Sequence, residues 1–100
     1  MTMNTTSALS LLETVYPNRA ELEQGVTKLM DMVRSQYQLR LKRYEQEMAA
    51  LEGEYRMDTA TFYRKFEAGE LGDREEYFDW AGLFELREDL LRKIELLERA

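Results

Sequence analysis

The sequence contains no cysteine and no histidine, and these two absences exclude several kinds of chemistry. Without cysteine there is no disulfide, no thiolate nucleophile and no sulfur ligand for a metal. Without histidine the chain lacks the commonest general base and the commonest ligand of transition metals. No glycine-rich phosphate loop is present, and no serine or threonine has a histidine to activate it. We therefore expect a protein that is not an enzyme, with no catalytic residue, no cofactor and no bound metal.

Turn-forming residues and long apolar runs are also scarce. Pro17 is the single proline, and five glycines among 100 residues provide too few turns for an all-β fold. No run approaches the ~18 apolar residues of a membrane span. The N-terminus lacks the basic start and apolar core of a signal peptide. The sequence therefore predicts an all-α protein with no membrane segment, located in the cytoplasm.

Apolar residues recur instead at helical spacing. Six of them follow one another at steps of 4-3-4-3-4, namely Tyr37, Leu41, Tyr44, Met48, Leu51 and Tyr55. This is the spacing of a coiled-coil seam, in which each side chain packs into a facing helix. An earlier part of the same stripe is formed by Leu22, Val26, Leu29 and Val33. A helix with such a stripe is not stable alone in water and must lie against another helix.

Capping signals divide the chain into helices. Asn18 and Glu21 have the spacing of a capping box, Asp58 or Thr59 caps a short helix, and Gly69 stands where a glycine ends one. The predicted helices cover about residues 8–16, 19–56, 59–68 and 74–98. Residues 1–6 are predicted to be a disordered tail, and residues 7–100 a single helical domain.

The two long helices are expected to form a long antiparallel helical hairpin that resembles a coiled coil, with the short helix 59–68 at its corner. The last helix is shorter than the first, so Leu22, Val26 and Leu29 are expected to lie beyond its reach. Either the N-terminal leucine segment or another chain would cover them. We predict that these three residues belong to a protein-binding surface.

The aromatic residues near the corner are predicted to form its core, namely Phe62, Phe66, Phe78 and Trp80. Glu70 and Asp73 have the spacing of the metal-binding Glu-x-x-Asp pair of all-α nucleoside-triphosphate pyrophosphatases. Those enzymes also need Glu-x-x-Glu on a facing helix, since Mg²⁺ prefers several oxygens around one centre. The long first helix has no such pair. We therefore interpret Glu70 and Asp73 as part of a loop and a helix cap.

The net charge is −6, which is opposite to the usual balance of nucleic-acid-binding proteins. Four cations without an intervening acid stand at Arg34, Arg40, Lys42 and Arg43. We interpret them as a solvated helix face that pairs with an acidic neighbour. A DNA-binding regulator that uses these cations is the less favoured alternative. The acidic excess favours a protein partner with a basic surface.

A resemblance to a known family rests on residues 55–73, YRMDTATFYRKFEAGELGD, followed by Tyr77-Phe78-Asp79-Trp80 and a leucine-rich helix. Over about residues 51–97 the chain resembles small helical prokaryotic proteins that are often encoded beside a small toxin-like protein. They look like antitoxins of toxin–antitoxin pairs. The resemblance implies a non-catalytic protein that binds and neutralises a basic toxin.

On that reading, five apolar or aromatic side chains would shape the corner, namely Tyr63, Phe66, Leu71, Tyr77 and Trp80. The acids that would face the partner are Glu70, Asp73, Glu75, Glu76 and Asp79. The rival hypothesis is a homo-oligomeric coiled-coil scaffold, a dimer or higher oligomer, in which a second copy fills the seam.

Overall fold

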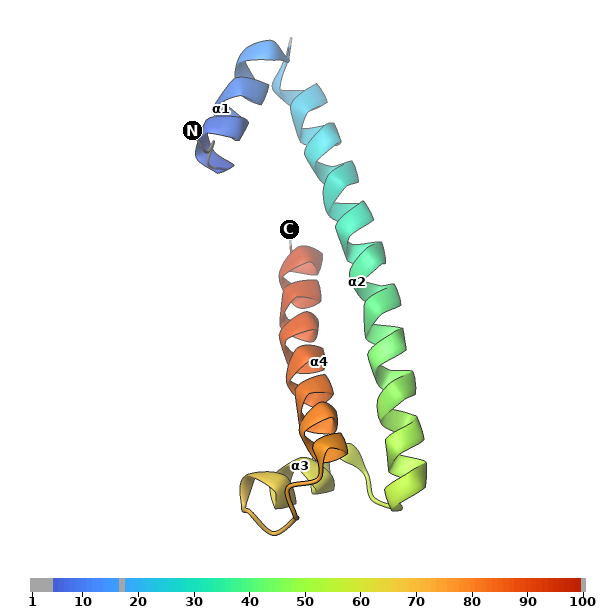
Figure 1. Ribbon diagram of the computed structural model, residues 1–100. Coiled ribbons are helices and arrows are strands. Elements are labelled where there is room, and N and C mark those ends of the chain that lie inside the picture. The colour runs from blue at the N-terminus through green and yellow to red at the C-terminus, as the bar shows by residue number, and fades with distance from the viewer. Residues whose placement is uncertain (1–4, 17, 100) are drawn as a thin grey trace. The chain divides into compact units, whose positions relative to one another are not determined.

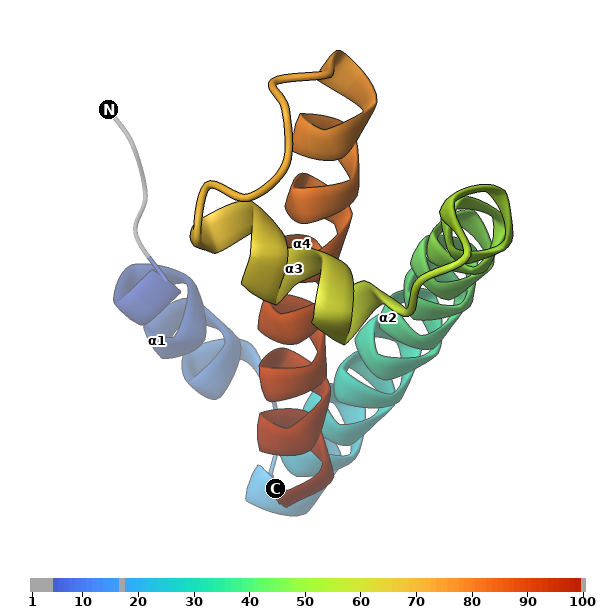
Figure 2. The same cartoon turned by 90° about the horizontal axis from the view of Figure 1, so that it is seen from below.

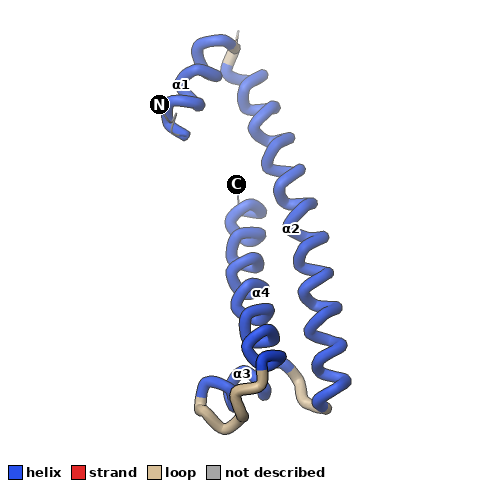
Figure 3. Tube along the Cα trace, viewed as in Figure 1, coloured by secondary structure: helices blue, strands red, loops and turns tan. Residues whose placement is uncertain are grey.

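The computed structural model describes residues 5–16 and 18–99, and these residues form helices and no strand. In chain order the helices are α1 (Thr5–Val15), α2 (Arg19–Tyr55), α3 (Thr59–Glu67) and α4 (Glu75–Arg99) (Figure 1). Figure 3 shows short loops between them. The predicted all-α class is confirmed.

Local hydrogen bonds cap two of the helices as predicted. Asn18 Oδ1 accepts a hydrogen bond of 2.8 Å from the backbone N–H of Glu21, at the start of α2. Asp58 Oδ1 accepts one of 2.7 Å from the backbone N–H of Thr61, at the start of α3. In both cases the side-chain oxygen pairs a backbone donor that has no partner within the helix.

The first helix differs most from its predicted bounds. It begins at Thr5, three residues before the expected start near residue 8, so the last two residues of the expected tail are helical. The remainder of that tail, residues 1–4, lies outside the described residues.

Gly69 ends α3 in the predicted way. Its φ of 71° lies in the left-handed region. The Gly69 N–H donates to the carbonyl of Phe66 at 3.1 Å, and the Glu70 N–H donates to that of Lys65 at 3.0 Å. These two bonds form a Schellman motif, which satisfies carbonyls at the end of the helix.

The packing divides the chain into two compact units, Met1–Val33 and Arg34–Ala100, with a boundary inside α2. We refer to them as unit 1 and unit 2. In unit 2, α4 runs antiparallel to the second part of α2, and α3 links the two (Figure 1). All six residues of the predicted stripe from Tyr37 to Tyr55 are buried or half-buried, which identifies this stripe as the packing face of α2. The predicted helical hairpin is confirmed.

The core of unit 2 lies where its three helices meet. It is formed by Met48 of α2, Phe62 of α3, and Trp80 and Ala81 of α4. The rings of Phe62 and Trp80 stack with their centroids 3.8 Å apart and their planes at 7°. Figure 2 shows α3 lying across α4, the arrangement that allows this stacking.

One predicted core residue lies elsewhere. Phe78 is 55% exposed, so its assignment to the core was wrong. Each helical residue turns the chain by about 100°, so Phe78 points about 200° away from Trp80. Because Trp80 faces the core, Phe78 faces the solvent.

Candidate protein-binding surfaces

Residues 66–86 cover the end of α3, the loop that follows it and the first half of α4. We name this segment the acidic corner. It contains seven acidic side chains, Glu67, Glu70, Asp73, Glu75, Glu76, Asp79 and Glu85, and one basic side chain, Arg74. The remainder of the chain contains thirteen acidic and thirteen basic residues, so the acidic corner holds the whole net charge of −6.

Four of the predicted partner-facing acids are accessible. Glu70, Asp73, Glu75 and Asp79 are exposed, and none of them forms an ion pair within the part of the chain that the structure describes. Glu75 stands in the first turn of α4, where the helix dipole favours a negative charge. Their charges are therefore available to a partner.

Phe78 adds an exposed aromatic ring to these acids. It meets Phe66 edge to face, with ring centroids 5.3 Å apart. The predicted binding residue Leu71 is half-buried and packs against the core, which holds the loop in place. Sequence reasoning missed the exposure of Phe78, although its angular distance from Trp80 on the helix was a signal for it.

Tyr63 and Trp80 shape the corner from within. The Tyr63 ring stacks on Phe84 at 4.2 Å, and its hydroxyl donates a hydrogen bond of 2.7 Å to Glu85 Oε1. This hydrogen bond to a carboxylate raises the pKa of Tyr63. Trp80 is 0% exposed, so it offers no surface to a partner, whereas Tyr63 is half-buried.

Glu76, the remaining predicted acid, is half-buried and faces Glu54 at the end of α2. Hydrogen bonding with Glu76, burial and the negative charge of Glu76 raise the pKa of Glu54, in that order of importance. Of the two carboxylate oxygens of Glu76, Oε1 is shielded from solvent and has no hydrogen-bond partner among the described residues. Arg74 partly offsets the two charges, but its guanidinium lies over the rings of Tyr55 and Tyr77, 5.9 and 5.6 Å from their centroids.

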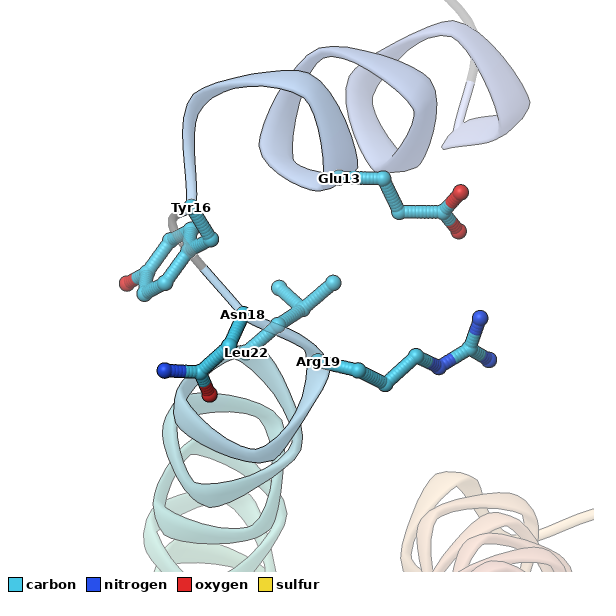
Figure 4. A pocket seen from close by; sticks show the side chains of 5 residues that line it. All are labelled: Glu13, Tyr16, Asn18, Arg19 and Leu22. Carbon is cyan, nitrogen blue, oxygen red and sulfur yellow. The ribbon is translucent and has the colours of Figure 1, made fainter.

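The three predicted binding residues of α2 belong to unit 1, and α1 covers them only in part. Leu22 is buried at 8% exposure, whereas Val26 is 36% and Leu29 is 59% exposed. Figure 4 shows Leu22 between the end of α1 and the start of α2, in a pocket that Glu13, Tyr16, Asn18 and Arg19 also line. The sequence allowed either the N-terminal leucine segment or another chain to cover these three residues. The N-terminal segment, α1, covers Leu22 and leaves Val26 and Leu29 accessible.

Unit 1 exposes many further apolar side chains. Every described side chain of α1, from residue 8 to residue 15, is exposed. The large apolar side chains exposed in the described part of unit 1 are Leu9, Leu11, Leu12, Val15, Tyr16, Val26, Leu29 and Met32. We name these residues the α1–α2 apolar surface. Contiguous exposed apolar patches are typical of interaction sites on soluble proteins, which makes these residues candidates for one.

The basic stretch of α2 shows no second feature of a nucleic-acid site. Arg40 lies over the ring of Tyr37, 5.5 Å from its centroid, on its own helix. Tyr37 is half-buried in the packing face. Base stacking requires an exposed aromatic ring, which Tyr37 does not offer.

Among the described residues, no group of three or more acidic side chains is arranged to hold a metal ion. None of the described helices has an apolar stretch long enough to cross a membrane.

Comparison of the chain with protein-family models, with curated proteins and with solved structures finds no match.

Proposed function

We propose that this chain is a non-catalytic protein of the cytoplasm whose acidic corner binds a small basic protein. The resemblance over residues 51–97 suggests that the partner is a toxin-like protein, which the chain neutralises by binding it. Such binding needs no catalytic residue, cofactor or metal. It needs a surface that complements the partner in shape and charge.

The placement of charge is the observation that supports this proposal most. Residues 66–86 carry a net charge of −6, while the other residues together carry none. A concentrated field of one sign attracts a partner of the opposite sign over about a Debye length, ~8 Å at physiological salt, and raises the rate of association. A basic partner is therefore drawn to this corner rather than to the chain as a whole.

Phe78 supplies the apolar contact that charges alone do not provide. Aromatic residues are enriched at the centres of interfaces, and polar and charged residues surround them. Phe78 is exposed and follows the start of α4, where Glu75 and Asp79 are also exposed. In the proposed complex an apolar side chain of the partner packs on Phe78, and basic side chains meet the surrounding acids.

The test recovers the tagged protein from its own cells and measures the mass of the intact complex. We expect a small basic protein in stoichiometric amount, which stops growth when it is expressed alone and not when this chain is coexpressed. Two variants should abolish both the binding of the partner and the rescue of growth. One combines Asp73→Lys with Asp79→Lys, and the other is Phe78→Ser. Glu45→Lys combined with Glu47→Lys is the matched control, because both residues are exposed on α2 and lie outside the corner.

Two results would reject the proposal. Recovery of this chain alone, with no second protein, would show that it has no stoichiometric protein partner in its cells. Equal loss of binding in the corner pair and in the control pair would show that overall charge, rather than the acidic corner, governs association.

A further inference from the structure

We infer that the α1–α2 apolar surface is the site at which two copies of this chain associate, each unit 1 packing against the unit 1 of the second copy. The residues involved lie outside the acidic corner. The inference is therefore independent of the proposed function and can fail without it.

The first argument is that α1 lacks enough contacts in one copy. It has 11 residues, fewer than the ~12–15 at which an isolated helix becomes marginally stable in water. Its sequence holds a single charged residue, Glu13, whereas a helix exposed to water normally has a charged face. Leu22 is the one residue buried in the described part of unit 1. The apolar side chains of α1 therefore require a further cover.

The second argument is the continuity of the stripe along α2. In unit 2 the residues of this stripe are buried or half-buried against a helix of the same chain. In unit 1 apolar residues recur at steps of 4-3-4, after an interruption of the heptad between Val33 and Tyr37, yet Val26 and Leu29 remain exposed. The same spacing requires the same kind of neighbour, a helix with an apolar stripe. Leu9 and Leu12 of a second copy provide such a stripe.

The third argument selects a second copy over another partner. Residues 1–33 contain four acidic and two basic residues, so unit 1 has a small net charge and both signs. Arg19 and Glu23 even form an ion pair with each other, at 3.4 Å. Its net charge is −2, compared with −6 in the acidic corner, so two copies of unit 1 repel each other much less than two acidic corners do, and unit 1 has no strong field of one sign to select a basic partner.

The arrangement of the two helices also fits a symmetric pair. Apolar residues are exposed on both α1 and α2 of unit 1. A layer of two helices with an apolar face is completed by a second layer of the same kind. In a dimer with a twofold axis, α1 of each copy packs on α2 of the other copy. Both copies then use the same surface, so no apolar surface is left to bind a third copy.

The test measures the mass of the full chain in solution by sedimentation equilibrium, from about 1 to about 100 µM. We expect the wild type to be a dimer. Leu12→Glu combined with Leu29→Glu should weaken the dimer at least about 100-fold, because it places charges in an apolar interface. Both residues are exposed in the single copy, at 40% and 59%, but they also line one hollow between α1 and α2, so the loss of the dimer counts only if the helix content of each copy persists. Circular dichroism checks this.

The matched control is Leu91→Glu combined with Leu96→Glu on α4, whose exposures of 39% and 63% are nearly the same. The control should remain a dimer. A wild type that stays monomeric over the whole range overturns the inference. So does a test pair that stays dimeric, or a control pair that dissociates as fully as the test pair. A monomeric chain that still binds its basic partner would reject this inference and leave the proposed function standing.

Discussion

The indole N–H of Trp80 donates a hydrogen bond of 3.0 Å to Thr59 Oγ1, and both side chains are buried. The backbone N–H of Thr59 in turn donates to Glu52 Oε2 at 2.7 Å. Thr59 therefore joins α2, α3 and α4 at one point beneath the acidic corner. The loop and the first turns of α4 rest on this junction.

Replacing Thr59 by valine should lower the free energy of unfolding by about 1–3 kcal/mol. Valine keeps the shape of threonine but leaves the buried indole N–H without an acceptor. Urea unfolding can be followed by the fluorescence of Trp80, the single tryptophan of the chain, and by circular dichroism. Thr27→Val, at an exposed site in α2, corrects for the change in helix propensity. Equal stability of the two variants would show that the hydrogen bond contributes nothing.

Replacing Glu76 by glutamine should stabilise unit 2 at neutral pH. The pKa of Glu54 is raised in the folded protein, so the stabilising contribution of that carboxyl is present at low pH and is lost as the pH rises through the raised value. Glutamine at position 76 carries no charge and can donate an amide hydrogen bond to the Glu54 carboxylate, so both contributions of Glu76 to the raised pKa of Glu54 are removed. The variant should therefore gain stability over the wild type between about pH 4 and about pH 7.

Urea midpoints measured across that range check this prediction. Glu75→Gln is the control, since Glu75 also lies in the first turn of α4 but is exposed, and the change removes the same favourable interaction with the helix dipole. A difference between the two variants that does not change with pH would contradict the proposed repulsion between Glu54 and Glu76.

Much of the fold was predictable because its signals are local. The caps at Asn18 and Asp58 and the glycine end at Gly69 depend on residues within a few positions of each other. The stripe from Tyr37 to Tyr55 gave the packing face of α2, because helical geometry fixes which residues share a side. These features need no knowledge of the rest of the chain.

The two surfaces were predictable only in part. The acids of the corner were named from the sequence, but the exposure of Phe78 depends on which side of α4 meets α3. In the same way, the burial of Leu22 and the exposure of Leu29 follow from where α1 lies on α2. Periodicity identifies an apolar stripe, yet it does not say how far a short neighbouring helix covers it.

Replacing Gly69 by alanine should destabilise the corner by about 1–2 kcal/mol, since an L-residue in the left-handed region brings Cβ close to the following carbonyl. The φ of Gly69 is 71°. Gly72→Ala is the control in the same loop, because its φ is not in that region and a Cβ there meets nothing within 4 Å. Urea unfolding of both variants tests the difference. If Gly72→Ala is as damaging as Gly69→Ala, the backbone conformation at Gly69 is not the cause.

Replacing Gly53 by alanine should stabilise α2 by about 1 kcal/mol, because glycine is that much less favourable than alanine inside a helix. Gly53 is exposed, and a Cβ at this position meets nothing within 4 Å, so no clash opposes the gain. The reverse change one turn away, Ala50→Gly, should lower stability by a similar amount, since Ala50 is exposed on the same helix. Thermal unfolding by circular dichroism measures both. A loss of stability in Gly53→Ala would mean that this side of α2 is packed in solution, by a second copy or by a partner.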